Sequence, residues 1–187
     1  AELDRRIAVL LRVNAEALGV HFPADLDLVG RFGELLRQAH ARTGQRAVVL
    51  VDEYDKPLLD NLTALDIARE MRDGLRNVYS VIKGADAHVR FAFLTGVSKF
   101  SKVSLFSDLN NLNDITLDAA YSAICGYTDL DVDTVFAPEL SGLDRQEVRH
   151  WYNGYNWTGT AVYNPFDVLL LFQKRQFRPW WFETGTP

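Results

Sequence analysis

The sequence predicts an α/β fold with helices packed on a parallel sheet, and two short apolar segments joined by a long amphipathic one carry this prediction. Residues 47–51 form a continuous apolar run rich in β-branched side chains, typical of a parallel strand buried on both faces. Residues 89–95 are expected to form a second buried strand. Between them, residues 66–83 repeat apolar side chains at helical spacing, so we expect a strand–helix–strand unit with a right-handed crossover.

Two further helices are expected before this unit. Residues 2–18 place leucine and isoleucine three, four and seven positions apart, and Gly19 is expected to end that helix. The second is expected over 28–42, with Gly44 closing it. In the strand–helix–strand unit itself, Gly84 is expected to cap the long helix.

After the second strand the pattern changes to a smaller, mainly helical and aromatic region. The polar stretch 96–116 is long for a loop inside a compact domain, and such loops are usually functional or disordered. Beyond it we expect three short helices, at 117–125, 131–140 and 144–152. A hairpin turn at 158–160 and a last helix from 164 or 165 to 173 should follow them. We therefore expect a core domain over 1–125 and a small subdomain over 126–187.

Composition restricts the functional class. The 187 residues, 48% of them hydrophobic, fit one compact domain with a sizeable core. The formal net charge of −5 gives no general attraction to nucleic acid or anionic lipid, although a local basic face leaves nucleic-acid binding open. The single cysteine, Cys125, has no partner for a disulfide or a zinc site, and no apolar run approaches the roughly 20 residues of a membrane helix. We expect a cytoplasmic protein without a membrane segment.

The strongest chemical signal is the junction of the first strand with Asp52 and Glu53. A buried strand ending in two acids is the Walker B pattern of P-loop ATPases, in which the aspartate orients magnesium through water and the glutamate polarises the attacking water. The alternative is an acidic strand end that caps the next helix or faces solvent, and the pattern alone does not separate the two.

Thr95 ends the second strand at the position called sensor 1, where P-loop ATPases commonly place a polar side chain within reach of the γ-phosphate and the lytic water. Its alternative role is a hydrogen bond within a turn that Gly96 permits. No stretch matches the phosphate-binding pattern of Gly, four residues and Gly-Lys-Ser/Thr. Its natural place is before Ala1, so we expect the sequence to begin inside a longer protein and to bind ATP and Mg²⁺ weakly or not at all by itself.

Three groups of sequence blocks together resemble those of a known protein family. They are VLVDEYDKPL at 49–58, FLTGVSKFSKVSLFS at 93–107 with LNNL at 109–112, and the aromatic blocks WYNGY at 151–155, YNPF at 163–166 and WFETGTP at 181–187. In these blocks the chain resembles the AAA-ATPase-like family of bacterial proteins, in which a P-loop ATPase domain is commonly followed by a PD-(D/E)XK nuclease-like region. The middle block is far more specific than the Walker B match.

The resemblance implies a partial P-loop NTPase (AAA-like) parallel sheet with helices, followed by a small, mainly helical and aromatic C-terminal subdomain. It implies that Asp52 organises magnesium, that Glu53 is the catalytic base and that Thr95 is the sensor, with ATP and Mg²⁺ as cofactors of the full-length protein. Asp55 belongs to the same motif, either as a partner behind the site or as a cap of the next helix. A nuclease-like region would follow Pro187.

The segment 98–114 adds Ser98, Lys99 and Lys102 as candidate nucleotide-binding residues. These side chains are expected to reach a γ-phosphate or the nucleotide of a neighbouring subunit, which would require self-association. The alternative is a self-bonded polar loop packed down by its phenylalanines.

The expected function is ATP binding and hydrolysis by the Walker B and sensor part of a larger bacterial protein, with the ATP cycle driving a conformational switch. The alternative is a nucleotide-independent interaction module that positions an attached nuclease-like or effector region. A third hypothesis, a metal-dependent nuclease built on Asp52, Glu53 and Asp55, lacks the separated acid and lysine that such sites use.

Overall fold

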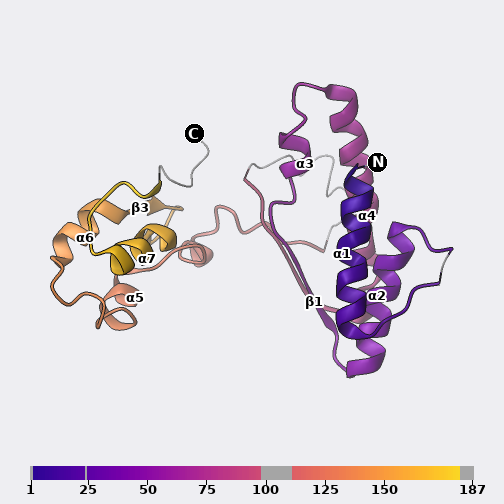
Figure 1. The fold of residues 1–187 in the computed structure, drawn as a ribbon, viewed down its shortest axis with the longest axis horizontal. Helices are drawn as coiled ribbons and strands as arrows, with labels where there is room; N and C mark the ends of the chain where they lie inside the picture. Colours follow the sequence, from indigo (N-terminus) through magenta and orange to yellow (C-terminus); the bar gives the residue numbers. More distant parts are fainter. Residues whose placement is uncertain (1, 24, 98–110, 182–187) are drawn as a thin grey trace. The chain divides into compact units, whose positions relative to one another are not determined.

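The structure is a computed structural model that describes residues 2–23, 25–97 and 111–181. The chain divides into two compact units, Ala1–Leu112 and Asn113–Pro187, which Figure 1 shows as indigo to magenta and orange to yellow ribbons. This division follows Leu112, and the domain boundary after residue 125 stays a prediction. None of the helices in the described residues combines the length and apolarity that a bilayer crossing requires.

The first unit is built on the expected strand–helix–strand arrangement. Strand β1 (Ala47–Val51) pairs in parallel with β2 (Val89–Leu94), and helix α4 (Leu65–Gly84) connects them together with the short α3 (Lys56–Leu59) and the 3₁₀ turn η1 (Asp86–His88). The mixed α/β class with a small parallel sheet is confirmed.

Two helices precede the sheet, as expected. Helix α1 (Glu2–Leu18) stops before Gly19, which takes a left-handed backbone conformation with φ +64°. Helix α2 (Leu28–Thr43) starts where the Asp27 carboxylate accepts the Gly30 N–H at 2.7 Å. Its end is Gly44, with φ +68°.

The expected cap at Gly84 is wrong. Gly84 is the last residue of α4, and Ala85 occupies the cap position with φ −98° and ψ 23°. Because Ala85 leaves the helix without a left-handed residue, this end does not need a glycine.

The core of the first unit lies between the helices and one face of the sheet. Helices α1, α2 and α4 stand on the same side of β1 in Figure 1. Its buried members are Leu36, Val49, Leu58, Leu75, Val78, Tyr79, Val81, Ile82, Ala85 and Val89.

The other face of the sheet is exposed, so the expectation of burial on both faces is wrong. Val48 and Leu50 of β1 are 55% and 71% exposed, and Phe91 of β2 is 54% exposed. Side chains alternate between the faces of a strand, and the described helices cover only the face that carries Val49. Phe91 stacks on Phe93, with ring centroids 6.2 Å apart.

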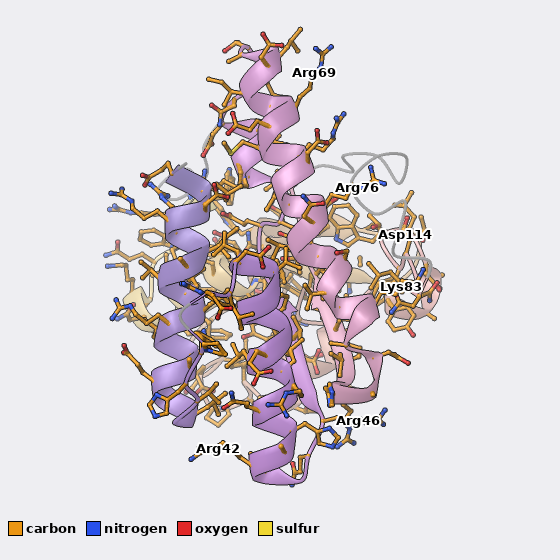
Figure 2. The ribbon with its side chains drawn as sticks, turned by 90° about the vertical axis from the view of Figure 1, so that its right-hand side faces the viewer. Arg42, Arg46, Arg69, Arg76, Lys83 and Asp114 are labelled. Carbon is orange, nitrogen blue, oxygen red and sulfur yellow. The ribbon has the colours of Figure 1, made fainter. Side chains whose placement is uncertain are left out.

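The solvent side of α4 carries a row of cations. Arg69, Arg76 and Lys83 follow one another at intervals of seven residues (Figure 2). Acids are interspersed along the same helix, and Arg69 lies 3.5 Å from Asp66. Binding of nucleic acid therefore stays an open prediction.

Two of the four histidines meet at the amino end of the sheet. His40 of α2 and His88 of η1 place their Nδ1 atoms 3.0 Å apart, which is a hydrogen-bond distance when one ring carries the proton. The sequence spacing of 48 residues gave no sign of this contact. The pair ties the end of α2 to the start of β2.

The second unit combines short helices with a hairpin. Helix α6 (Arg145–Tyr152) leads into β3 (Asn153–Asn156), which pairs antiparallel with β4 (Ala161–Tyr163), and α7 (Pro165–Lys174) follows. The expected hairpin, helix 144–152 and last helix are confirmed. A core formed by Val132, Val148, Tyr152, Tyr163, Val168, Leu171 and Trp180 joins these elements.

Two expected helices of this unit are shorter than the sequence indicated. The stretch 117–125 contains only the 3₁₀ turn η2 (Ala119–Tyr121). Helix α5 (Asp129–Thr134) begins with a capping box between Thr128 and Asp131 and ends well before residue 140. Pro138 lacks an amide donor and disfavours the helical conformation at the residue before it, so a helix from this start does not run through to residue 140.

A charged network holds α5, α6 and β4 together. The buried Tyr163 hydroxyl donates to Asp129 at 2.6 Å and accepts from Arg145 at 2.7 Å, and Arg145 also donates to Asp129 at 2.7 Å. The Tyr163 hydrogen bond is the largest cause that lowers the pKa of Asp129; burial opposes it, and the bond from Arg145 adds to the lowering.

We predict that Tyr163→Phe lowers the free energy of unfolding by about 1–3 kcal/mol at pH 7, because it removes the hydrogen bond to Asp129 and the one from Arg145 while it keeps the ring. The carboxylate contributes this stability above its unfolded pKa of about 3.9 and loses it as the pH falls through its lower folded value. The deficit should therefore shrink below about pH 4 in denaturant titrations. Tyr155→Phe, at a half-exposed tyrosine of β3, is the control and should change stability by less than about 0.5 kcal/mol.

Candidate functional site

The acidic residues and the sensor candidate meet at the carboxyl edge of the sheet. Register pairs Val51 with Leu94, so the residues that follow the two strands lie side by side. The Thr95 hydroxyl donates to Asp52 Oδ1, and the Glu53 N–H donates to the same oxygen at 3.0 Å. The structure thus brings Thr95 to Asp52 and Glu53, although more than forty residues separate it from them in the sequence.

Backbone hydrogen bonds continue this pairing past the strands. The Thr95 N–H donates to Val51 O at 2.9 Å, and the Tyr54 N–H donates to Thr95 O at 2.9 Å. Asp52 and Glu53 lie between these two attachments. Their backbone is therefore fixed to the neighbouring strand on both sides.

Glu53 has an uncommon backbone conformation, with φ +49°. For a residue with a side chain this left-handed conformation costs roughly 1–2 kcal/mol, and such strain concentrates at functional sites. The Lys56 N–H donates to Glu53 O at 3.0 Å and helps to hold the turn. The side chains of Asp52 and Glu53 are both exposed at this edge.

Asp55 behaves differently from its two acidic neighbours. It is fully buried, and its Oδ1 accepts the Val97 N–H at 3.1 Å. Asp55 occupies the cap position of α3, but its side chain makes no capping hydrogen bond there. The motif left two roles open for this side chain, a partner behind the site or a cap of α3. The structure contains no capping bond and does contain the contact with the chain after β2.

The edge suits a cation that keeps most of its water. Among the residues that the structure describes, no three or more His, Cys, Asp or Glu side chains gather as a metal site. One exposed carboxylate, Asp52, fits Mg²⁺, which is usually held by one or two carboxylates together with waters and substrate phosphates. The three-acid nuclease hypothesis is not supported, because Asp55 is buried and bonded to Val97 while the other two acids are exposed.

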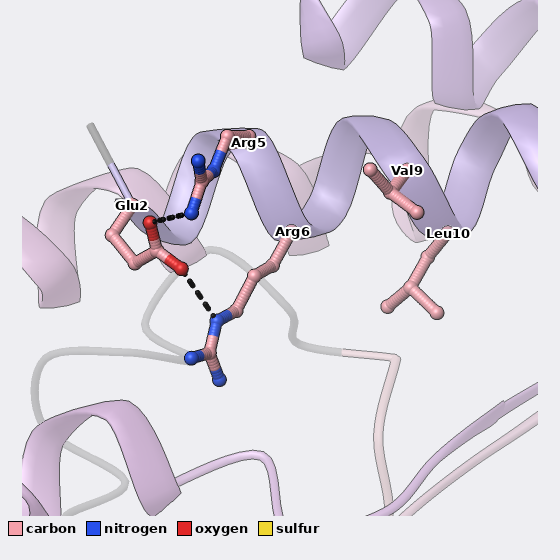
Figure 3. A pocket seen from close by; sticks show the side chains of 5 residues that line it. All are labelled: Glu2, Arg5, Arg6, Val9 and Leu10. Atoms are coloured by element: carbon pink, nitrogen blue, oxygen red, sulfur yellow. Dashed lines mark hydrogen bonds and ion pairs between the residues drawn. The ribbon is translucent and has the colours of Figure 1, made fainter.

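The remaining candidates, Ser98, Lys99 and Lys102, lie outside the described residues, and their roles stay predictions. The exposed hollow in Figure 3 is lined by a single helix, α1, with the aliphatic Val9 and Leu10 beside the acid of Glu2. There Glu2 accepts hydrogen bonds from Arg5 and Arg6 at 2.5 and 3.0 Å. Because its described lining comes from α1 alone and its charges are paired, we assign it no chemistry.

Close packing at Gly96 allows a direct test of this geometry. A Cβ added there would lie 2.5 Å from Tyr54 Cε1 and 2.9 Å from Asp55 Oδ1. We predict that Gly96→Ala lowers the free energy of unfolding by about 1–3 kcal/mol in thermal or denaturant melts. Gly74→Ala is the matched control: no atom lies within 4 Å of its added Cβ inside α4, so it should stabilise by about 0.5–1 kcal/mol. Equal effects of the two substitutions would contradict the packing described.

Comparison with known proteins places the chain in a family. A family described as "Predicted AAA-ATPase" (AAA-ATPase_like) matches residues 1–106. The chain is also 72% identical over 186 residues to an "Uncharacterized protein in vnfD 5'region" of Azotobacter chroococcum mcd 1, and the match covers 100% of this chain but 36% of that relative. No solved structure gives a significant match. On the family match over more than half of its residues, the chain belongs to the AAA-ATPase-like family.

Proposed function

We propose that this chain supplies the acid-and-sensor edge of an ATP-hydrolysing AAA-like module in a longer protein. The observation that carries this proposal is the hydrogen bond from the Thr95 hydroxyl to Asp52 at the carboxyl edge of a parallel sheet. Ligands of open α/β sheets bind outside this edge. Family membership supports the reaction class, and the site residues give it a mechanism.

In this proposal each residue has a separate task. Asp52 accepts hydrogen bonds from Thr95 and from the Glu53 backbone on a single oxygen, Oδ1, which fixes the carboxylate and leaves Oδ2 to face the waters of a magnesium ion. Glu53 is exposed beside it and accepts a proton from the attacking water. Thr95 orients Asp52 through its single hydroxyl proton, and it would have to turn that proton away from Asp52 to donate to a terminal phosphate.

ATP and Mg²⁺ are the cofactors that this assignment requires. When bound, the ion neutralises the charge that develops on the transferred phosphoryl group. The chain's own residues orient that ion through water and take up a proton. Backbone amides and a lysine of a phosphate-binding loop would have to come from another segment, because these 187 residues contain no such motif.

One observation favours the second candidate, an interaction module. The exposed face of the sheet presents Val48, Leu50 and Phe91 to solvent, and contiguous apolar surface of this kind marks contact sites. This face does not depend on the acidic edge, so an interaction module would keep its activity when Glu53 is neutralised. ATP turnover distinguishes the two candidates.

We predict that Glu53→Gln in the full-length protein retains nucleotide binding while ATP turnover falls roughly 10²-fold or more, because a positioned base contributes about that factor. Asp52→Asn should raise the Mg²⁺ concentration that half-maximal turnover requires, because it removes the charge that orients the ion. A phosphate-release assay over a magnesium titration measures both effects. Glu70→Gln, at an exposed glutamate of α4, is the control and should leave turnover unchanged.

Two outcomes would contradict the proposal. Unchanged turnover in the Glu53 variant would remove this residue from the mechanism. Calorimetry of residues 1–187 with Mg²⁺ and ATP should give little or no heat of binding, and tight binding would mean that the phosphates are held without the expected loop.

A further inference from the structure

A buried carboxylate stands behind the acidic edge and is not used by the mechanism above. Asp55 is 0% exposed, and burying a carboxylate without hydrogen bonds is strongly unfavourable. Its described partner is the N–H of Val97, a residue whose side chain is 75% exposed and which lies three positions beyond the end of β2. The buried Asp55 carboxylate thus binds the backbone N–H of Val97, a residue whose side chain is exposed.

Among the described residues, three hydrogen bonds join backbone groups of residues 95–97 to residues 51–55, and this bond is the outermost of them. The first two run between backbone groups, from Thr95 N–H to Val51 O and from Tyr54 N–H to Thr95 O. Beyond Tyr54 the chain turns into α3, and the backbone hydrogen bonds of the described residues do not continue the ladder. The Asp55 side chain provides the third acceptor, for Val97.

The surroundings of Asp55 leave little room for movement. Gly96 lies so close that an added Cβ would be 2.9 Å from Asp55 Oδ1. On the core side is Tyr79 of α4, whose pKa is raised to about 12, first by burial and then by the charges of Tyr54 and Asp55. Asp55 is therefore enclosed between α4 and the chain that follows β2.

We propose that Asp55 is the positioning residue of the acidic edge: its carboxylate holds Val97 and thereby keeps the Thr95 hydroxyl on Asp52. This inference deepens the proposed function and, for its consequence in catalysis, rests on it. Asp55 does not touch nucleotide or water in this role. It acts through the backbone of residues 95–97.

Amide hydrogen exchange of residues 1–187, resolved by NMR, tests the contact without any assumption about ATP. In the unchanged protein the Val97 amide should be protected, although its side chain faces solvent. Asp55→Ala should accelerate its exchange roughly tenfold, and more than that of Val49 in β1, whereas Asp55→Asn keeps an acceptor and should stay within about threefold. An unprotected Val97 amide in the unchanged protein would overturn the inference, even if the alanine variant does not fold. Equal acceleration at Val97 and Val49 would also overturn it, because that pattern reports a loss of global stability.

Steady-state kinetics of the full-length protein test the catalytic consequence. Asp55→Ala should lower kcat for ATP roughly tenfold with KM changed by less than about threefold, and Asp55→Asn should restore most of kcat. If the unchanged protein does not hydrolyse ATP, the proposed function fails while the exchange data still decide the positioning role. If the unchanged protein turns over ATP and Asp55→Ala has the same kcat, the inference alone fails.

Discussion

The parallel pairing of β1 with β2 is the constraint on which the candidate site depends. Parallel strands end at the same edge of a sheet, so a pair formed in the observed register, Val51 against Leu94, must place the next residues of both strands together. Asp52 and Thr95 are those residues. A slip of one position would move Thr95 away from Asp52 and would also exchange the two faces of β2.

The candidate site also depends on helix packing away from the carboxyl edge, because that packing stabilises the strand pair. Val49 and Val89 are buried against α2 and α4, and this one-sided core fixes the face and the register of both strands. Two strands are marginal without such support. The helices therefore stabilise the site although none of their exposed side chains belongs to it. The second unit has its own core and its own charged network around Tyr163.

Local periodicity predicted the elements well, because it reports which side of each segment is apolar. The bounds of β1 and α1 match the expectation, α2 is one residue longer at its end, and α4 is one residue longer at each end. Burial of β1 on both faces was wrong, because an apolar run does not say how many layers cover it. The helix expected over 131–140 does not run through to residue 140 for a local reason, the proline at 138.

At the site, the motif predicted which side chains would lie together but not how they are connected. Asp52, Glu53 and Thr95 were named from strand ends, and the structure brings them together. The role of Asp55 was open, because its partner is a backbone amide more than forty residues away, and backbone donors leave no trace in a motif. The contact of His40 with His88 escaped for the same reason of distance in sequence.

The central claim is that Thr95 and Asp52 interact at the edge of the sheet, and a double-mutant cycle on folding stability tests it most directly. Asp52→Ala, Thr95→Val and the double variant should give a coupling free energy of about 1 kcal/mol in denaturant titrations, since residues in one hydrogen-bonded network are not additive. Additivity of the two substitutions within about 0.3 kcal/mol would show that the side chains do not meet, and would contradict the account.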